Sequence, residues 1–268
     1  MTAAIPDYRN VFDLAGRVAL VVGGGSGIGR AGALGLAAFG ATAVVADVNR
    51  EGAEETARLI AARGGRAEAR TADARSTASV DALVADTVAA HGAVDVLLAM
   101  PALNIRKRLA EYSDEEFDRV IDLNLKGTFR LARAAARQMM KQRQGSIILM
   151  SSIRGTSVEP GQSIYGSTKA GISLMTKGLA SELAQYGVRV NAIAPGIIAT
   201  PLTKPIRDHP EWSRVYAARA AIQRWAEPAE LVGPIVLLAS EAGSYMTGTT
   251  VFVDGGWSAI DGRYEPPV

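Results

Sequence analysis

Tyr165 and Lys169 are the residues of this sequence whose types and spacing most directly suggest chemistry. Lying four residues apart, they would share one face of a helix. The lysine ammonium would favour the phenolate and lower the tyrosine pKa, which at its ordinary value of about 10 suits a general base poorly. Ser152, thirteen residues before the tyrosine, could donate a hydrogen bond to the same substrate oxygen. Together the three side chains predict proton exchange with a hydroxyl or carbonyl oxygen.

A glycine-rich turn near the N-terminus predicts a nucleotide site that would serve this chemistry. The apolar run 18–22 is typical of a buried strand, and it leads through residues 23–29 into a helical stretch at 27–39. Strand, glycine turn and helix in this order indicate a dinucleotide fingerprint, in which the backbone approaches a pyrophosphate at a helix N-terminus. This context disfavours the alternative of a flexible turn without a ligand. The turn residues expected to contact the cofactor are Gly23, Ser26, Gly27, Ile28 and Gly29.

Asp47 predicts which nicotinamide cofactor is bound. It ends the next apolar strand, 42–46, eighteen residues after Gly29. A carboxylate at that place can accept both ribose hydroxyls and would repel a 2′-phosphate. Ser26 adds no positive charge for such a phosphate, and Arg50 is the one nearby residue that could. The sequence therefore predicts NAD, with NADP less favoured; the open alternative for Asp47 is a helix-capping carboxylate.

In order along the chain, these motifs resemble the short-chain dehydrogenase/reductase family over about residues 14–258. Residues 22–29 match the family's Thr-Gly-x-x-x-Gly-Ile-Gly, with Val22 in place of the threonine. Residues 191–196 match the segment that holds the nicotinamide carboxamide, and 254–256 match the C-terminal signature. The resemblance implies catalytic roles for Asn124, Ser152, Tyr165 and Lys169. Beyond the glycine turn and Asp47, it implies cofactor contacts at Asp73, Ala74, Tyr165, Lys169, Pro195, Gly196, Ile198 and Thr200.

The resemblance also implies a division of labour among the catalytic residues. Tyr165 would exchange a proton with the substrate oxygen while a hydride passes between the substrate carbon and the nicotinamide. Lys169 would lower the tyrosine pKa and hold the nicotinamide ribose, and Ser152 would polarise the reacting oxygen. Asn124 would hold a water that links Lys169 to solvent. A polar helix break is the alternative for Asn124, and Ser151 is the alternative to Ser152.

One segment departs from the family pattern. Where relatives carry Asn-Asn-Ala-Gly after the fourth strand, this chain has Ala99-Met100-Pro101-Ala102. Pro101 lacks an N–H, and the Cβ of Ala102 disfavours a positive φ. We therefore expect reduced or rebalanced affinity for NAD.

Strand and helix patterns alternate along the whole chain. Such alternation predicts βαβ units, and hence a single Rossmann-type α/β domain with a doubly wound parallel sheet and helices on both faces. We expect this domain at 14–258, between extensions at 1–13 and 259–268. Strands are predicted at 18–22, 42–46, 67–71, 94–99, 145–150, 188–193 and 249–253, and helices near 27–39, 51–63, 76–91, 114–143 with a break, 163–186 and 228–239.

Composition argues against several other classes of protein. A net charge of +2 with both signs interspersed gives no reason to expect a nucleic-acid partner. The absence of cysteine removes disulfides and thiolate metal sites and fits the reducing cytoplasm, where we place the protein. His91 and His209 offer little material for a metal site or a serine–histidine triad, so no metal is expected. The sequence shows no signal peptide and no apolar run of about 18 residues, so no membrane association is expected.

Three variable segments, 103–109, 153–164 and 197–226, are expected to line the substrate pocket, the last as a mobile lid. The first two resemble the gluconate 5-dehydrogenase-like branch, which implies a sugar acid or polyol and its keto form. The substrate residues we predict are Arg106, Arg154 and Gln162, because arginine pairs with carboxylates. The open alternatives are solvated loop charges and, for the lid aromatics, subunit contacts.

Other functions remain open at this stage. Within enzymes, the same motifs serve 3-oxoacyl-thioester reductases and other ketone reductases, and a basic run at 106–108 would suit a phosphopantetheine carrier. Outside enzymes, the chain could be a catalytically silent NAD-sensing protein. The resemblance further implies a homodimer or homotetramer, paired through helices near 126–143 and 163–186.

Overall fold

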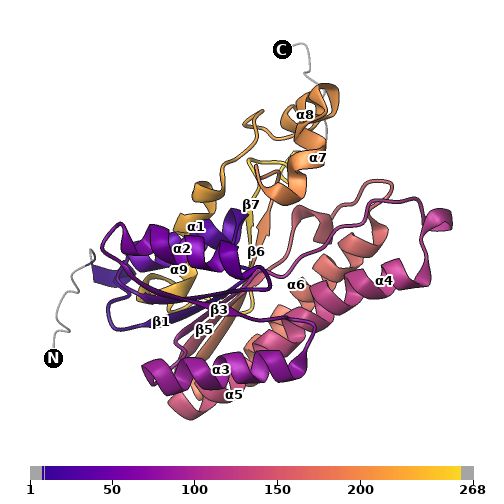
Figure 1. The fold of residues 1–268 in the computed structure, drawn as a ribbon. Helices are drawn as coiled ribbons and strands as arrows, with labels where there is room; N and C mark the ends of the chain where they lie inside the picture. Colours follow the sequence, from indigo (N-terminus) through magenta and orange to yellow (C-terminus); the bar gives the residue numbers. More distant parts are fainter. Residues whose placement is uncertain (1–7, 9, 261–268) are drawn as a thin grey trace.

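Seven parallel strands form one sheet in the computed structural model, which describes Tyr8 and residues 10–260 (Figure 1). Their order across the sheet is β3-β2-β1-β4-β5-β6-β7, and each neighbouring pair is parallel. The doubly wound Rossmann-type sheet is thereby confirmed. The strands are Val18–Val22 (β1), Thr42–Asp47 (β2), Arg66–Thr71 (β3), Val96–Ala99 (β4), Gly145–Met150 (β5), Val188–Pro195 (β6) and Thr250–Val253 (β7).

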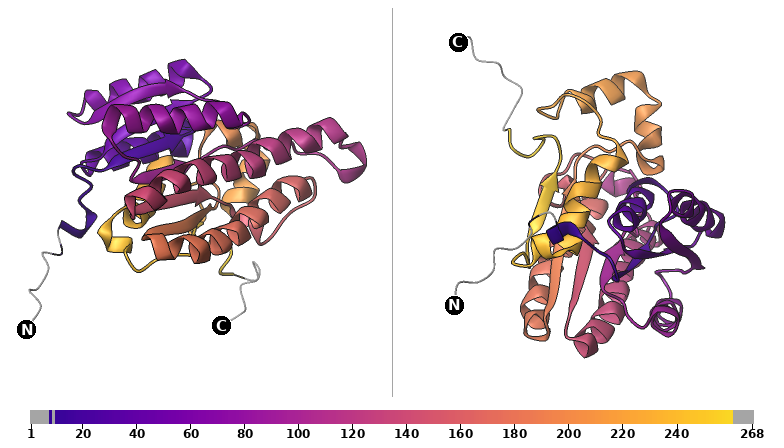
Figure 2. Two further views of the ribbon diagram at one scale, coloured as in Figure 1. Left: turned by 90° about the horizontal axis from the view of Figure 1, so that it is seen from below. Right: turned by 90° about the vertical axis from the view of Figure 1, so that its left-hand side faces the viewer.

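Helices cover both faces of the sheet, as Figures 1 and 2 show. One apolar core joins α1, α2 and α9 to one face, and a second joins α3, α5 and α6 to the other. Apolar runs such as Val18–Val22 form central strands because every one of their side chains is buried. The helices are Gly27–Ala38 (α1), Arg50–Ala61 (α2), Thr77–His91 (α3), Asp114–Ile121 (α4), Thr128–Gln142 (α5), Ser163–Leu183 (α6), Lys204–Arg207 (α7), Pro210–Ala217 (α8) and Val232–Ala239 (α9).

The strand order places the candidate site. β1 lies between β2 and β4, so the chain winds outward to β3 and then returns past β1 to begin the other half of the sheet. Ligands of open α/β sheets bind at such a switch point, outside the carboxyl ends of the strands. The glycine turn follows β1, Asp47 ends β2, and Ser152 follows β5, so all three lie at this edge.

The predicted helix at 114–143 is divided by a π-helical stretch. α4 begins with a capping box, in which Ser113 and Glu116 bond each other's backbone N–H. Residues Asp122–Gly127 then form a π-helix before α5 begins. A π-bulge of this kind often marks a functional position, and here it carries Asn124. The predicted break is therefore present, with a form that the sequence pattern did not specify.

The 197–226 segment, called the lid segment below, rises beyond the carboxyl edge of the sheet (Figure 1). It contains α7 and α8 and forms a third apolar cluster around Tyr216 and Trp257. Whether it is mobile stays a prediction. The extensions predicted at 1–13 and 259–268 fall largely outside the described residues, and their boundaries stay predictions too. Within the described part of the chain, no helix has both the length and the apolar character needed to cross a bilayer.

Candidate active site

The turn between β1 and α1 leaves room for a phosphate group. A Cβ added at Gly29 would lie 2.0 Å from the carbonyl oxygen of Gly23, so no side chain fits there. Gly27 has a φ of +52°, which favours glycine. Ser26 is the N-cap of α1 and makes no side-chain capping bond, and the first turn of α1 contains no acidic residue. The backbone N–H groups and the positive helix end can therefore serve an anion, which fits the pyrophosphate of a dinucleotide.

Asp47 is fixed beside this turn. Its Oδ2 accepts a hydrogen bond from the N–H of Gly25 at 2.9 Å, and its Oδ1 accepts one from the N–H of Asn49 at 2.9 Å. A Cβ at Gly25 would lie 2.8 Å from Oδ2, so the glycine allows the carboxylate to approach. Arg50, the nearby cation, is paired with Glu54 at 2.7 Å. The carboxylate is thus held where a cofactor ribose would meet it.

Asp73 and Ala74 line a groove that continues from the glycine turn past Asp47. The Asp73 carboxylate is engaged by Arg75, with Nη2 at 2.8 Å from Oδ2 and Nε at 3.0 Å from Oδ1. This hydrogen-bonded pair holds the pKa of Asp73 below its ordinary value. The predicted contact of Asp73 with adenine would therefore have to coexist with Arg75.

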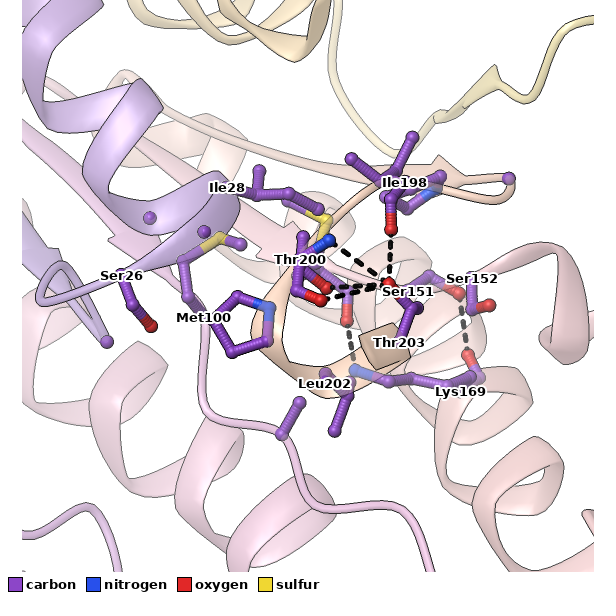
Figure 3. A pocket seen from close by; sticks show the side chains of 18 of the residues that line it. Ser26, Ile28, Met100, Ser151, Ser152, Lys169, Ile198, Thr200, Leu202 and Thr203 are labelled. Atoms are coloured by element: carbon purple, nitrogen blue, oxygen red, sulfur yellow. Dashed lines mark hydrogen bonds between the residues drawn. The ribbon is translucent and has the colours of Figure 1, made fainter. Parts of the chain in front are cut away.

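Ser152, Tyr165 and Lys169 line one pocket together with the glycine turn. Figure 3 shows Ser152 and Lys169 in this pocket, with Ser26 and Ile28 of the turn. Tyr165 and Lys169 come from successive turns of α6, while Ser152 follows β5. The remaining predicted cofactor residues of β6 and the segment after it line the same pocket: Pro195, Gly196, Ile198 and Thr200. The structure therefore brings together residues from four distant parts of the sequence.

Ser151 also lines this pocket, but its hydroxyl is engaged by other groups. Its hydroxyl donates to the carbonyl oxygen of Lys169 at 2.9 Å and lies 2.8 Å from the hydroxyl of Ser173. Ser152, by contrast, hydrogen-bonds the Tyr165 phenol and thereby favours the phenolate. The arrangement favours Ser152 over its neighbour as the residue beside the reacting oxygen.

The two titratable groups of the pocket are shifted by burial. Burial raises the pKa of Tyr165 to about 12, although the Ser152 hydrogen bond and the charge of Arg154 act in the opposite direction. Burial lowers the pKa of Lys169 to about 8. The Lys169 ammonium donates to the carbonyl oxygen of Met150 at 2.8 Å and lies 5.5 Å from the centre of the Tyr165 ring. The prediction that Lys169 leaves the tyrosine with a lowered pKa is therefore wrong for this arrangement, because burial outweighs the nearby charges.

Asn124 uses its side chain to hold the loop after β4. Its Oδ1 accepts from the N–H of Leu103 at 2.7 Å, and its Nδ2 donates to the carbonyl oxygen of Leu103 at 2.8 Å and to Thr168 at 3.3 Å. The carbonyl oxygen of Asn124 accepts from Thr128 at 2.6 Å. A water of the predicted relay would have to use the hydrogen-bonding capacity of Asn124 that these bonds leave free, and the relay stays a prediction.

The segment Ala99–Ala102 forms one wall of the cofactor groove. The N–H of Met100 donates to the carbonyl oxygen of Val22 at 2.9 Å. Met100 and Ala102 line the pocket beside the glycine turn, and Pro101 lines the adjoining groove. A Cβ at Gly23 would lie 3.0 Å from the Met100 Cβ, so this wall is close to the turn.

The predicted substrate residues meet at Glu159, which lies in the predicted pocket segment 153–164 but was not among the predicted substrate residues. Arg106, Arg154 and Gln162 all bond its carboxylate, as does Tyr216 of the lid segment. Burial alone would raise the pKa of Glu159, but the hydrogen bonds and the arginine charges outweigh it and keep that pKa below its ordinary value. The two predicted substrate arginines, Arg106 and Arg154, are thus already paired with a carboxylate of the chain itself. Its role in binding substrate stays a prediction.

Comparison with known proteins identifies the family. The family described as enoyl-(acyl carrier protein) reductase matches residues 23–258. This chain is a short-chain dehydrogenase/reductase. It is 36% identical over 244 residues to a 3-oxoacyl-(acyl-carrier-protein) reductase of Thermotoga maritima, covering 91% of this chain and 98% of that protein. It is 37% identical over 254 residues to the 2-dehydro-3-deoxy-D-gluconate 5-dehydrogenase of Escherichia coli, covering 93% and 98%.

A solved structure gives the same answer for the fold. The crystal structure of a gluconate 5-dehydrogenase from Burkholderia cenocepacia, in complex with NADP and tartrate, matches with a TM-score of 0.90 and 34% identity. The match covers 94% of this chain and 98% of that one. The family resemblance is thus confirmed, and the protein belongs to a family of oxidoreductases whose solved relatives include proteins bound to a nicotinamide cofactor. The relatives include both a gluconate 5-dehydrogenase and a 3-oxoacyl reductase, so both substrate classes remain open.

Within the described residues, no group of histidine, cysteine, aspartate or glutamate side chains could hold a metal ion.

Proposed function

We propose that this protein is an NAD-dependent oxidoreductase that interconverts a secondary alcohol and a ketone on a polar, polyhydroxylated substrate. The observation that carries the proposal is the single pocket shared by Ser152, Tyr165, Lys169 and the glycine turn. A proton-exchanging phenol beside a dinucleotide site is the arrangement that such a reaction requires. When bound, the nicotinamide supplies or accepts the hydride.

The residues of the pocket divide the remaining work. With a pKa raised to about 12, the Tyr165 phenol is protonated at neutral pH and can donate a proton to the oxygen of a ketone. Ser152 can donate to the same oxygen as negative charge develops on it. Lys169 lies behind the phenol, where its charge would stabilise the phenolate formed once the proton has left. Oxidation of an alcohol needs that phenolate at the start, so its rate is expected to rise with pH.

The preference for NAD rests on Asp47. Its carboxylate is held by two backbone N–H groups beside the turn, and a 2′-phosphate would meet a negative charge there. Arg50, the cation that could offset this charge, is already paired with Glu54. The relative from Burkholderia cenocepacia was solved with NADP, so the proposed preference for NAD needs a direct measurement.

A sugar acid or polyol is the substrate class we propose. The names of the gluconate-dehydrogenase relatives support it, and so do the amide and arginine side chains of the predicted pocket segments. The second candidate is reduction of a 3-oxoacyl thioester, which the Thermotoga maritima relative supports. A catalytically silent NAD sensor is the third, and the assembled Ser152, Tyr165 and Lys169 argue against it.

The proposed function is tested by following nicotinamide absorbance with NAD and NADP against polyols, sugar acids and β-ketoesters. We expect turnover of a polyol or sugar acid with NAD, and none by Tyr165→Phe although the variant still binds NADH. Turnover of ketoesters alone with NADPH would establish the second candidate. Cofactor binding without turnover of any substrate would establish the sensor.

We also propose a homodimer or homotetramer that works in the cytoplasm. Phe129 on α5 and Leu174 on α6 are 43% and 70% exposed, which supports pairing through these helices. Light scattering tests the assembly, and a monomer would contradict it.

A further inference from the structure

Glu159 lies at the centre of a polar cluster that the proposed mechanism does not use. Its Oε1 accepts hydrogen bonds from Arg106, from the Tyr216 hydroxyl and, at 2.6 Å, from Nε2 of Gln162. Its Oε2 pairs with Nη2 of Arg154 at 3.0 Å. The Glu159 side chain is 24% exposed and that of Arg154 is 8% exposed, so water screens these charges only in part. The carboxylate therefore interacts strongly with every donor around it.

The cluster joins the three variable segments that we predict to line the substrate pocket. Arg106 comes from the loop between β4 and α4, and Glu159 and Gln162 come from the loop between β5 and α6. Tyr216 comes from α8 of the lid segment. One carboxylate thus connects all the variable segments in which substrate selectivity would be expected to reside.

The cluster is also coupled to the reacting groups. The backbone N–H of Arg154 donates to Oγ of Ser152 at 3.1 Å. Burial raises the pKa of Tyr165, and the charge of Arg154 partly opposes that rise, so this guanidinium is close enough to act on the phenol. Gln162 is the N-cap of α6, three residues before Tyr165. A change of charge at Glu159 would therefore be felt where the substrate reacts.

Both arginines are already engaged on their edges and on their faces. Arg106 lies over the ring of Trp212 at 4.9 Å, and Arg154 lies over that of Trp257 at 5.2 Å. An arginine pair of this kind would suit a substrate carboxylate, but here the chain supplies a carboxylate of its own. A substrate carboxylate would have to displace Glu159 or lie beside it. Displacement would leave the partly buried charge of Glu159 unpaired, and a position beside Glu159 would bring two negative charges together.

The hydrogen-bond pattern next to the cluster favours a hydroxyl group instead. A carboxylate only accepts, so Gln162 must present its Nε2 to Glu159 and its Oε1 to Nδ2 of Asn104, 2.9 Å away. This order fixes the Asn104 amide and leaves its Oδ1 as a buried acceptor with no partner among the described residues. A substrate that reached this buried oxygen could donate a hydroxyl hydrogen to it, whereas a carboxylate would be repelled.

We propose that Glu159 is a specificity-determining residue: it occupies Arg106 and Arg154 in place of a substrate carboxylate, so that the pocket selects an uncharged polyol, or its ketone, over the corresponding sugar acid. This inference rests on the proposed function and narrows its substrate class. Glu159 does not take part in the hydride or proton transfer.

The test uses two substrates that differ in a single group. D-Glucitol carries a hydroxymethyl group where D-gluconate carries a carboxylate, and kcat/KM for NAD reduction is measured with each. We expect the natural protein to prefer D-glucitol. Glu159→Gln keeps the shape and should move the ratio toward D-gluconate by about tenfold or more, because one unit charge is removed from a partly buried site. Arg106→Gln leaves Glu159 less neutralised and should move the ratio the other way.

Two further variants separate charge from structure. Tyr216→Phe removes the hydroxyl tie to the lid segment but keeps the charges, so it should change both rates and leave the ratio in place. Glu111→Gln removes a carboxylate from the same outer recess that forms no ion pair with either arginine within the described residues, and it should leave the ratio unchanged. A natural preference for D-gluconate, or equal effects of Glu159→Gln on both substrates, would overturn the inference.

A binding measurement keeps the inference testable if neither substrate is turned over, an outcome that would reject the proposed substrate class. All three tryptophans of the chain lie in the apolar cluster beside Glu159, so intrinsic fluorescence reports on its occupancy. Titration with D-gluconate should then give a dissociation constant about tenfold lower for Glu159→Gln than for the natural protein. Equal constants would reject the role of Glu159 independently.

Discussion

Replacing Lys169 by methionine is expected to stabilise the folded protein at pH 7 while it abolishes turnover. The side chain is 1% exposed, and its ammonium donates to the carbonyl oxygen of Met150. Burial lowers its pKa from 10.5 to about 8. That difference corresponds to roughly 3 kcal/mol of destabilisation at neutral pH, at about 1.4 kcal/mol per pKa unit. Loss of the hydrogen bond to Met150 destabilises the variant by about 1 kcal/mol, so the net gain in the free energy of unfolding is about 2 kcal/mol.

The gain depends on pH in a direction that the two pKa values fix. Between pH 8 and pH 10.5 the unfolded chain binds more protons at Lys169 than the folded chain does, so the natural protein becomes more stable as pH rises. The advantage of the variant is therefore full below pH 8 and fades toward pH 10.5. Tyr165 acts in the opposite sense, since its folded pKa of about 12 makes both proteins lose stability above pH 10.

Urea unfolding followed by tryptophan fluorescence, at pH 7 and pH 9.5 and at one protein concentration, measures this difference. Lys177→Met is the matched control, because Lys177 is exposed on the same helix and its replacement should change stability little. The reasoning is refuted if Lys169→Met is less stable than the natural protein at pH 7. It is refuted equally if the advantage is the same at both pH values, because burial of charge would then not be its source.

Three further substitutions, with Gly178→Ala as a control, test the cofactor side of the site. Gly29→Ala places a Cβ 2.0 Å from a backbone oxygen, so we expect the free energy of unfolding to fall by about 2–4 kcal/mol, measured by thermal unfolding. We also expect loss of NADH binding, measured by NADH fluorescence. Gly178→Ala, in open space on α6, should instead gain about 0.5–1 kcal/mol. Asp47→Ser should raise the kcat/KM ratio of NADP to NAD about tenfold or more, and an unchanged ratio would contradict the role of the carboxylate. Asn124→Ala should release both backbone groups of Leu103, lowering kcat and raising KM for NAD, and unchanged kinetics would exclude that positioning role.

Most of the sheet could be predicted from the sequence because β1, β2, β4, β5 and β6 are short, largely apolar runs buried on both faces. The predicted ranges 18–22 and 145–150 coincide with β1 and β5, and the others differ from the observed strands at their ends by two residues or fewer. The glycine turn could be predicted equally well, because the carbonyl oxygen of Gly23 approaches Gly29 so closely that only glycine fits there. Features that depend on local sterics or on a local burial pattern can be predicted because residues close together in the sequence determine them.

Features set by tertiary surroundings could not be predicted in the same way. The spacing of Tyr165 and Lys169 placed them on one helix face, but the extent of burial decides the sign of the tyrosine pKa shift, and spacing does not contain it. Glu159 belonged to a predicted pocket segment, but its central place among the arginines could not be predicted. Its partners Arg106 and Tyr216 lie 53 and 57 residues away in the chain, so only the folded structure brings their charges together.

Asn124 helps to hold in place the loop that departs from the family pattern at Ala99–Ala102. The segment Ala99–Ala102 carries no side-chain amide, so its own side chains offer no amide hydrogen bonds to the neighbouring backbone. The π-helix turns Asn124 toward the loop, and its amide bonds both the N–H and the carbonyl oxygen of Leu103. Met100 anchors the other end through its own N–H on Val22. The wall of the cofactor groove is therefore held from both ends by bonds that do not depend on the altered side chains, and a chain with this substitution can keep the groove in place.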